Sequence, residues 1–443
     1  MAKILYNLIF PLLFLASWPY YMFRMVRRGH FRRHFSQRLG IYRQPVRDRL
    51  ARLHNPLWIH AVSVGEMMIA LALVRALRIR RPGQDIVLST TTSTGRAVAE
   101  KETDAHTAVI YSPVDLGPSV ASAFRTIRPS ALMLVEQEIW PNHLWQARRR
   151  GVPVWLVNGR MSERSERRFR RIRSLTRPIL QLLDIVCVQD ERDRARFAGA
   201  GFPAHALFVT GNIKYELDGQ PVESLAGELR LAAGWSESDP VFMAGSTFPG
   251  EEEILLQVYA SLKKNHPRLR FFLVPRHAER TPALRPLIEA AGWRVRLRTE
   301  EGTAAPGESA DVFILNTTGE LRRTYGLATM VFMGKTLKAP EGQGCQNFLE
   351  AAQEGKPIVL GPRIENFRAA VEEFRSGGGL VQVEDAAGLE RVLREWLEQP
   401  EKARQTGARA AEIFQGKRGA VRMTVDMIEG LLINRESNPG SGG

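Results

Sequence analysis

The sequence predicts an α/β protein with two Rossmann-like domains that face a cleft and an N-terminal hydrophobic membrane-anchor helix. Beyond residue 55, short apolar runs alternate with amphipathic stretches, as in parallel strands joined by helices. A polar stretch containing Gly, Pro and Glu interrupts this alternation once, near the middle of the chain. Near the start of the chain lies a long segment without charge.

Composition restricts the class of protein. With 443 residues, the chain has room for about two to three domains of about 150 residues each. A hydrophobic content of 44% with 25% charged residues is typical of a globular protein and excludes disordered and collagen-like chains. The two cysteines, Cys187 and Cys345, form no Cys or Cys/His pattern, which argues against a structural zinc site and a disulfide-stapled fold.

The net charge of +15 favours a polyanionic partner: a nucleic acid, an anionic membrane or phosphorylated ligands. No zinc-finger or RNP-like aromatic–basic pattern accompanies the arginines, so no nucleic-acid partner is expected. A basic peripheral protein that binds anionic lipid or nucleic acid is the non-enzyme alternative.

The uncharged segment, residues 4–23, is just long enough to cross a bilayer. Trp18, Tyr20 and Tyr21 near its end are typical of a membrane interface. A basic cluster follows, made of Arg24, Arg27, Arg28, Arg32, Arg33 and Arg38. Such a cluster stays on the cytoplasmic side and attracts anionic headgroups. Residues 1–35 are therefore expected to be a membrane anchor with a basic juxtamembrane segment, single-span or half-inserted. The alternative is a helix packed on the body of the protein.

Residues 36–217 are expected to form the N-terminal Rossmann-like domain. Its strands are expected at residues 57–61, 86–89, 108–111, 131–135, 154–157 and 185–188. Residues 218–239 are expected to be a linker, and residues 240–433 the C-terminal Rossmann-like domain. The second set of strands is expected at residues 241–244, 271–274, 295–297, 312–315, 330–333, 358–360 and 380–383. Residues 401–433 read as helix and residues 434–443 as a disordered tail.

Ligands of parallel α/β sheets bind beyond the carboxyl ends of the strands, so the loops that follow strands should carry the chemistry. Glu66 follows the first strand, where it can accept a proton from an attacking hydroxyl or complement the helix dipole. A hydroxyl run that ends at Thr94 and Gly95 caps a helix or binds an oxyanion. Later loops of this domain carry paired carboxylates and an Asn–Arg pair, at Glu136, Glu138, Asn158 and Arg160.

In the second half, Ser246 and Thr247 end a strand at a site suited to a phosphate. Arg276 and His277 end the next strand and can clamp a phosphate or carboxylate. Two further loops enter helices with hydroxyl, Gly, amide or carboxylate groups, at Thr318, Gly319, Glu320, Asn347 and Glu350. Glu350 can hold vicinal ribose hydroxyls or can be an ordinary helix-surface residue.

These motifs, in this order, resemble those of the Kdo (3-deoxy-D-manno-octulosonate) transferases of lipopolysaccharide assembly. The resemblance covers essentially the whole chain. The matching elements are Ser63-Val64-Gly65-Glu66, Thr94-Gly95, Glu138-Ile139-Trp140-Pro141-Asn142, Asn158-Gly159-Arg160-Met161-Ser162, Gly211-Asn212-Ile213-Lys214, Ser246-Thr247, Gly250-Glu251-Glu252, Pro275-Arg276-His277, Gly319-Glu320-Leu321, Asn347 and Glu350. Each motif alone is a weak indication of the family, whereas the ordered set is specific for it.

The resemblance implies an inverting glycosyltransferase of the GT-B fold that uses CMP-Kdo and needs no cofactor and no obligatory divalent metal. It implies that Glu66 is the general base, which deprotonates the 6′-hydroxyl of a tetraacyl disaccharide lipid A precursor. Donor-binding roles fall on Ser246, Thr247, Arg276, His277, Thr318, Gly319, Glu320, Asn347 and Glu350. Acceptor-side roles fall on Thr94, Gly95, Glu136, Glu138, Asn158 and Arg160. Anionic lipid of the inner membrane is a further expected partner, at its cytoplasmic face.

The sequence departs from the family pattern at four places. Glu136-Gln137-Glu138 replaces the family's Glu-Thr-Glu, and Asn316 replaces the Asp of its Asp-Thr-x-Gly-Glu-Leu motif. Lys335 and Gln346 replace a Gly and a His in two further loops. All but the first lie on the donor side. The alternative enzyme is therefore another GT-B glycosyltransferase with a different nucleotide-sugar donor and lipid acceptor.

Overall fold

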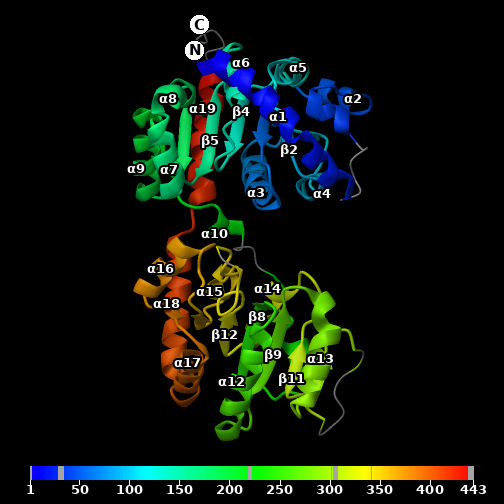
Figure 1. The fold of residues 1–443 in the computed structure, drawn as a ribbon, viewed down its shortest axis with the longest axis vertical. Coiled ribbons are helices and arrows are strands. Elements are labelled where there is room, and N and C mark those ends of the chain that lie inside the picture. The colour runs from blue at the N-terminus through cyan, green and yellow to red at the C-terminus, as the bar shows by residue number, and fades with distance from the viewer. Residues whose placement is uncertain are drawn as a thin grey trace. The chain divides into compact units, whose positions relative to one another are not determined.

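A computed structural model describes residues 2–27, 34–217, 222–300, 302, 308–340 and 342–437. The chain divides into two compact units, Met1–Leu217 with Arg418–Gly443, and Asp218–Lys417 (Figure 1). The predicted cluster members Arg28, Arg32 and Arg33, residues 218–221 of the linker and residues 438–443 of the tail lie outside the described residues. The same holds for the side chains of residues 17–27.

The first unit is built on a parallel sheet of seven strands, in the order β3-β2-β1-β4-β5-β6-β7. Its strands are β1 (Leu57–His60), β2 (Ile86–Thr90), β3 (Thr107–Tyr111), β4 (Ala131–Val135), β5 (Val154–Gly159), β6 (Ile185–Val188) and β7 (Leu207–Val209). Its helices are α1 (Ala2–Arg27), α2 (Val46–Ala51), α3 (Val64–Arg80), α4 (Ser93–Glu100), α5 (Gly117–Ile127), α6 (Pro141–Arg148), α7 (Glu163–Arg171), α8 (Arg173–Leu180), α9 (Glu191–Ala200), α10 (Lys214–Leu217) and α19 (Ala420–Ser437). The six predicted strands are confirmed, and the short β7 was not predicted.

The second unit repeats this design, with the parallel order β10-β11-β9-β8-β12-β13-β14. Its strands are β8 (Val241–Thr247), β9 (Arg270–Pro275), β10 (Val295–Leu297), β11 (Val312–Ile314), β12 (Met330–Met333), β13 (Ile358–Leu360) and β14 (Val381–Gln382). Its helices are α11 (Ala226–Ala233), α12 (Glu251–Asn265), α13 (Thr281–Ala290), α14 (Leu321–Thr324), α15 (Leu349–Gln353), α16 (Arg368–Ser376), α17 (Ala386–Glu398) and α18 (Pro400–Gly416). All seven predicted strands are confirmed.

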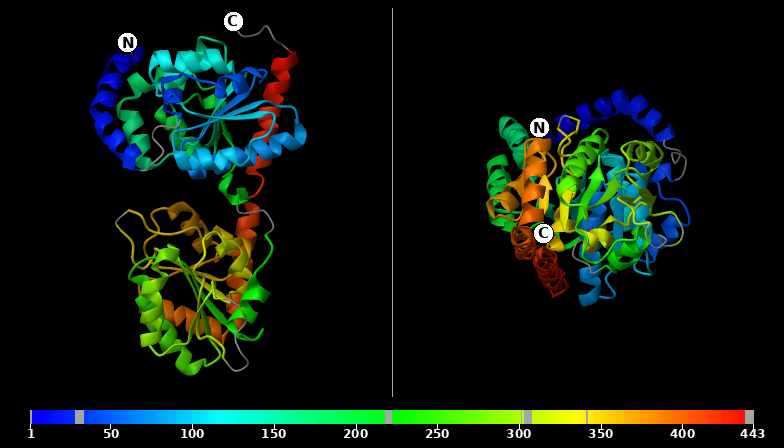
Figure 2. Two further views of the ribbon diagram at one scale, coloured as in Figure 1. Left: turned by 90° about the vertical axis from the view of Figure 1, so that its right-hand side faces the viewer. Right: turned by 90° about the horizontal axis from the view of Figure 1, so that it is seen from below.

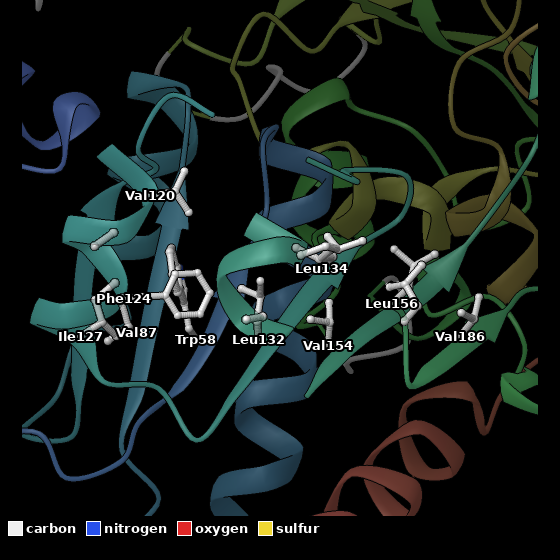
Figure 3. Packing of buried hydrophobic residues seen from close by; sticks show 14 of the residues in the cluster. Trp58, Val87, Val120, Phe124, Ile127, Leu132, Leu134, Val154, Leu156 and Val186 are labelled. Carbon is white, nitrogen blue, oxygen red and sulfur yellow. The ribbon is translucent and has the colours of Figure 1, made fainter. Parts of the chain in front are cut away.

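Apolar side chains cover both faces of the first sheet, because successive residues of a strand point to opposite sides. Trp58 and Val87 lie in one cluster, whereas Leu57 and Leu88 lie in the other. Figure 3 shows part of the first cluster, where the Trp58 and Phe124 rings meet edge to face at 5.1 Å between centroids. Helices lie on both sides of the sheet in each unit (Figure 2). Buried on both faces, these strands read as continuous apolar runs, which is why they were predictable.

Two predicted domain boundaries were wrong. Residues 418–433 were assigned to the second domain, but α19 belongs to the first unit, where Val425 and Ile428 are buried in the cluster that contains α3. The predicted single helix 401–433 ends at Gly416, and α19 begins after Gly419, whose φ is 109°. The described part of the predicted linker is not separate from the second domain either, because α11 belongs to the second unit and buries Leu229.

The N-terminal helix α1 packs against the first unit through one of its faces. The Tyr6 hydroxyl donates to Asp115 Oδ2 at 2.8 Å, and Asn142 Nδ2 donates to Asn7 Oδ1 at 3.0 Å. The Phe10 ring meets the edge of Trp140 at 6.3 Å. This face of α1 therefore fits the alternative prediction, in which the helix packs on the body of the protein. Among the described residues, no helix is both long and apolar enough to cross a membrane.

Replacing Phe124 by Ala should lower the free energy of unfolding by about 3–5 kcal/mol, because it leaves a cavity beside Trp58. The matched change is Ile79→Ala on α3, where the side chain is 83% exposed. That change should stay within about 0.5 kcal/mol of the parent chain. Urea unfolding followed by circular dichroism measures both. Equal losses in the two variants would contradict the described core.

Candidate functional site

The strand order of the first sheet reverses between β1 and β4, and ligands of open α/β sheets bind outside the carboxyl ends of strands at such a point. Three glutamates follow these two strands. Glu66 lies in the first turn of α3, after β1, whereas Glu136 and Glu138 follow β4. The fold therefore brings the predicted base and two predicted acceptor-side carboxylates to one sheet edge.

The Glu66 carboxylate is held by the turn that precedes α3. The Val62 amide donates to Glu66 Oε2 at 2.8 Å, and the Ser63 hydroxyl donates to Glu66 Oε1 at 2.8 Å. Ser63 is the N-cap residue of α3 and accepts in turn from the Glu66 amide at 3.3 Å. The side chain thus lies in the first turn of α3, as the helix-dipole interpretation expects, and the general-base interpretation stays a prediction.

The threonine-rich loop after β2 fixes this turn from the other side. The hydroxyls of Thr90 and Thr92 donate to the Val62 carbonyl at 3.0 and 3.1 Å. Gly95 lies against them: a Cβ there would come within 2.8 Å of both hydroxyl oxygens, so only glycine fits. Of the two predicted acceptor-side residues in this loop, Thr94 is exposed and Gly95 is buried.

Glu136 forms an ion pair with Lys214 Nζ at 2.6 Å. Its φ of 60° is rare for a residue with a side chain and costs of order 1 kcal/mol or more, a strain typical of functional sites. Asn158 positions the lysine: its side chain is fully buried and its Oδ1 accepts from the Ile213 amide at 2.9 Å. The predicted neighbour Arg160 is exposed at the end of β5.

Glu138 has a different environment from its two neighbours. Its Oε2 accepts from Trp140 Nε1 at 3.1 Å. Burial and the charge of Glu66 raise the pKa of Glu138 to about 7, with a smaller contribution from Glu136, while the Trp140 hydrogen bond acts in the opposite direction. This carboxyl group therefore titrates near neutral pH, as the acid–base groups of active sites often do.

The second sheet reverses its strand order between β8 and β12, and here a buried glutamate joins the two strand ends. Glu251, in the first turn of α12, accepts from the Phe248 amide and from the amides of Lys335, Thr336, Leu337 and Lys338 at 2.7 to 3.3 Å. Burial raises the pKa of Glu251, and these hydrogen bonds oppose the shift. The loop after β12 is thereby fixed beside Ser246.

The predicted Ser246 and Thr247 end β8, and they differ in exposure. Ser246 has a φ of 53° and is half-buried, whereas Thr247 is fully buried and donates to Glu252 Oε1 at 2.8 Å. Glu252 in turn accepts from Arg280 Nη2 at 3.2 Å. Thr247 therefore has a structural partner already, and Ser246 is the more accessible of the two.

Arg276 and His277 are exposed at the carboxyl end of β9, next to β8 in the sheet. Thr318 and Gly319 are exposed after β11, on the far side of β9. Burial would raise the pKa of Glu320, but a hydrogen bond from Thr317 and the charge of Arg298 lower it, so Glu320 is ionised. These residues place two basic side chains and a glycine turn along neighbouring strand ends.

Asn347 and Glu350 lie at the start of α15, after a loop that packs against residues 334–338. The Cys345 amide donates to the Lys335 carbonyl at 2.7 Å, and the Gly344 amide donates to Glu365 at 2.9 Å. Asn347 Oδ1 accepts from the Leu349 amide at 3.1 Å. Both predicted residues are half-buried at the same sheet edge as Ser246 and Arg276.

Taken separately, the two edges offer different chemistry. The first unit offers carboxylates that can accept a proton, with one lysine beside them. The second offers Arg276, His277 and backbone amides, which suit an anionic group such as a phosphate. In the described ranges, no group of three or more His, Cys, Asp or Glu residues is arranged to hold a metal ion.

Three residues at these two sheet edges were given no role in the sequence analysis. Lys214 was part of a matched motif but had no role, because its pairing with Glu136 joins distant loops. Trp140 was likewise only part of a matched motif, whereas its indole N–H donates to Glu138. Glu251 was also only part of a matched motif. Its position after Gly250 was the available signal, but the loop that it binds lies more than 80 residues further along the chain.

Comparisons with known proteins show which family the chain resembles. A family model described as 3-deoxy-D-manno-octulosonic-acid transferase (kdotransferase) matches residues 33–217. The chain is 32% identical to the 3-deoxy-D-manno-octulosonic acid transferase of Bordetella pertussis, over 86% of this chain and 89% of that protein. It is 29% identical to the protein of the same name from Haemophilus influenzae, over 92% of this chain and 93% of that protein.

Among solved structures, the chain is similar to Anabaena HepE in complex with UDP, with a TM-score of 0.56 and 16% identity. The match covers 85% of this chain and 99% of that one. At this identity the likeness concerns the fold alone: an α/β fold with two parallel sheets, as in GT-B proteins.

Replacing Glu251 by Gln should lower the free energy of unfolding by roughly 2–4 kcal/mol, because the carboxamide puts an N–H₂ group among backbone N–H donors. The exposed Glu253 on the same helix turn provides the matched control, Glu253→Gln. Hydrogen exchange should show lost protection at the amides of residues 335–338 in the first variant only. Unchanged protection there would contradict the described role of Glu251.

Proposed function

The chain belongs to the 3-deoxy-D-manno-octulosonic acid transferases, and on this premise we propose that it transfers Kdo from CMP-Kdo to the 6′-hydroxyl of a tetraacyl disaccharide lipid A precursor. As a member of this family the protein is a glycosyltransferase. The observation that carries the finer proposal is the position of Glu66. It lies at the carboxyl end of β1, at the point where the strand order reverses, with both oxygens oriented by hydrogen bonds.

In this proposal Glu66 is the general base. Its carboxylate takes the proton of the acceptor hydroxyl as the hydroxyl oxygen bonds to the anomeric carbon of Kdo. The bond from that carbon to the phosphate oxygen breaks, and CMP leaves with the electron pair. Attack opposite to the leaving group inverts the anomeric configuration. The hydrogen bonds from Val62 and Ser63 support this role, because they hold the base in one orientation before the substrate arrives.

The donor binds in the second unit. Arg276 and His277 hold the CMP phosphate or the Kdo carboxylate, and Ser246 and residues 318–320 surround the phosphate. The buried Thr247 supports the end of β8 through its hydrogen bond to Glu252. Asn347 and Glu350 hold the nucleotide and its ribose. Exposed basic groups and backbone amides at one sheet edge support this assignment, since they stabilise a leaving phosphate electrostatically. The reaction then proceeds without a divalent metal or another cofactor.

The acceptor binds at the first unit, near Thr94, Gly95, Glu136, Glu138, Asn158 and Arg160. Arg160 is exposed and suits an anionic group of the lipid precursor. The Glu136–Lys214 ion pair places a cation beside the carboxylate that follows β4. Asn158 contributes indirectly, because its buried side chain fixes the turn that precedes Lys214.

The protein acts at the cytoplasmic face of the inner membrane, held there by α1. One face of α1 packs on the first unit through Tyr6 and Phe10. The other face is apolar and exposed, with exposed fractions from 41% for Leu5 to 68% for Ile4. Its members are Ile4, Leu5, Leu8, Ile9, Leu12, Leu13 and Leu15. A helix docked along one face and apolar on the other lies in the membrane surface, which favours the half-inserted anchor.

Basic side chains beside α1 supply the affinity for anionic lipid. Helix α8 packs beside α1, and α7 precedes it in the chain. Their exposed arginines are Arg164, Arg167, Arg168, Arg170, Arg171, Arg173 and Arg177. Each basic residue near an anionic membrane surface contributes about 1 kcal/mol. Anionic inner-membrane lipid is therefore the third partner, with CMP-Kdo and the lipid A precursor.

Glu66→Gln should reduce turnover by about 10²-fold or more with CMP-Kdo binding unchanged, because an amide cannot accept the proton. The measurement is CMP release from CMP-Kdo with and without a tetraacyl lipid A precursor. Glu191→Gln, an exposed change on α9, should keep full turnover. Turnover at the parent level in the Glu66 variant would remove Glu66 from the mechanism. CMP release that needs a different acceptor, or only another nucleotide sugar, would favour the alternative glycosyltransferase.

The triple change Leu8→Gln, Leu12→Gln and Leu15→Gln should weaken binding to vesicles by at least about tenfold, because it removes apolar surface from the lipid-facing side of α1. The control is Ile79→Gln, an exposed apolar residue on α3. Co-sedimentation with vesicles that contain phosphatidylglycerol measures binding, and turnover on detergent-dispersed acceptor should not change. Equal binding by the triple variant and the control would exclude α1 as the membrane contact.

A further inference from the structure

Two basic residues lie on opposite sides of β8 at the carboxyl edge of the second sheet. Strand β8, which contains Ser246, pairs with β9 on one side and with β12 on the other. Arg276 follows β9, and its amide donates to the Thr247 carbonyl at 3.0 Å. Lys335 lies two residues after the end of β12. Because adjacent strands are about 4.8 Å apart, both cations are within reach of one ligand bound at the end of β8.

The backbone of Lys335 is held in a conformation that few residues with a side chain adopt. Its φ is 61°, which costs of order 1 kcal/mol or more. The Lys335 amide donates to Glu251 Oε2 at 2.7 Å, and the Lys335 carbonyl accepts from the Cys345 amide at 2.7 Å. These two hydrogen bonds keep the strained backbone in place, so the side chain starts from one fixed position at the strand end.

The Lys335 ammonium lies beside the segment that leads into α12. Its Nζ is 5.3 Å from the centre of the Phe248 ring and donates to Gln343 Oε1 at 3.4 Å. The Phe248 amide donates to Glu251, so the same carboxylate fixes both the ring and the lysine backbone. Among the residues that the structure describes, the ammonium is in no ion pair with a carboxylate. An ammonium has three N–H donors, and Gln343 uses one of them.

Lys335 is also next to the loop that leads to Asn347 and Glu350. The Cys345 amide, which bonds the Lys335 carbonyl, lies two residues before Asn347. Asn347 and Glu350 are proposed above to hold the nucleotide, whereas Arg276 lies on the other side of β8. In a nucleotide sugar the phosphate is joined directly to the nucleoside, and the sugar's carboxylate lies beyond it. Lys335, the cation beside the nucleoside loop, is therefore the one suited to the phosphate.

We propose that Lys335 binds the phosphate of CMP-Kdo and that Arg276 binds the carboxylate of its sugar. The donor carries these two negative charges, and the two cations flank β8. Lysine binds a phosphate as a point charge, and the attraction grows as the phosphate gains charge on leaving. Lys335 itself forms no covalent bond and transfers no proton. The proposal rests on the proposed function, which identifies the donor.

The experiment compares the affinities of the full chain for cytidine and CMP, which differ only by the phosphate. Isothermal titration calorimetry measures both in the parent and in Lys335→Met, which keeps the length of the side chain without its charge. The affinity for CMP should fall by about tenfold in the variant, with the affinity for cytidine unchanged. Lys335→Arg should restore most of the loss. Lys264→Met, an exposed change near the other end of α12, should bind both ligands like the parent.

Lys335→Gly decides the matter if Lys335→Met does not fold. Glycine adopts a φ of 61° without strain, so this variant should unfold near the temperature of the parent. It should show the same loss of CMP affinity, again with cytidine binding unchanged. Thermal unfolding followed by circular dichroism measures folding. A lysine with a structural role alone would change the affinities for the two ligands equally or leave both unchanged.

Two further variants distinguish Lys335 from the other cations. Arg276→Met should keep the affinity for CMP, which has no sugar, and should raise KM for CMP-Kdo in acceptor-dependent CMP release. Lys338 is the other lysine near the start of α12, exposed and with its side chain against Gly250. Lys338→Met should keep the affinity for CMP.

The outcomes separate this inference from the proposed function. Parent-level CMP affinity in Lys335→Met and Lys335→Gly overturns the role of Lys335 and leaves the proposed function standing. A parent chain that binds CMP no more tightly than cytidine has the same consequence. Loss of CMP affinity in Arg276→Met or Lys338→Met overturns the assignment of the phosphate to Lys335. A parent chain that binds neither cytidine nor CMP overturns the proposed donor, and with it the proposed function.

Discussion

The turn at Val62 is the constraint on which the acid–base edge of the first unit depends. Its amide donates to the Glu66 carboxylate, and its carbonyl accepts from the hydroxyls of Thr90 and Thr92. The N–H and C=O groups of Val62 therefore both help to fix the position of the Glu66 side chain. The turn is tied to β1 by the chain and to β2 by these hydroxyls. A base oriented in this way loses little freedom when a substrate hydroxyl arrives.

The second unit uses a first-turn glutamate in the same place for a different purpose. Glu251 follows β8 as Glu66 follows β1, and both begin a helix at a reversal of strand order. Glu251 is fully buried and satisfied by five backbone amides, so it holds a loop instead of taking part in chemistry. Glu66 accepts two hydrogen bonds, and 9% of the residue is exposed. The number of local donors thus differs between Glu251, which fixes a loop, and Glu66, which we propose as the general base.

Strand positions were predictable because buried parallel strands are continuous apolar runs, as in β1 and β4. The edge that carries Glu66 was predictable for the same reason, since parallel strands end together. The pairing of Glu136 with Lys214 was not, because it joins loops far apart in the sequence. Nor does periodicity show which sheet a helix covers, so the return of α19 to the first unit was missed. Asn158 illustrates a third limit: a polar residue near the end of a strand is equally suited to bind a ligand or, as here, to be buried and fix a turn.

The most direct test of the account is a structure of the Glu66→Gln variant with CMP-Kdo and the lipid A precursor bound, because transfer is slow in that variant and the acceptor stays in place. The account predicts the 6′-hydroxyl oxygen at about 2.6–3.2 Å from the carboxamide that replaces the Glu66 carboxylate. It also predicts that the acceptor's sugar lies over the ends of β1 and β4. An acceptor hydroxyl bound away from position 66, with another side chain in hydrogen-bond contact, would contradict the assignment of the base.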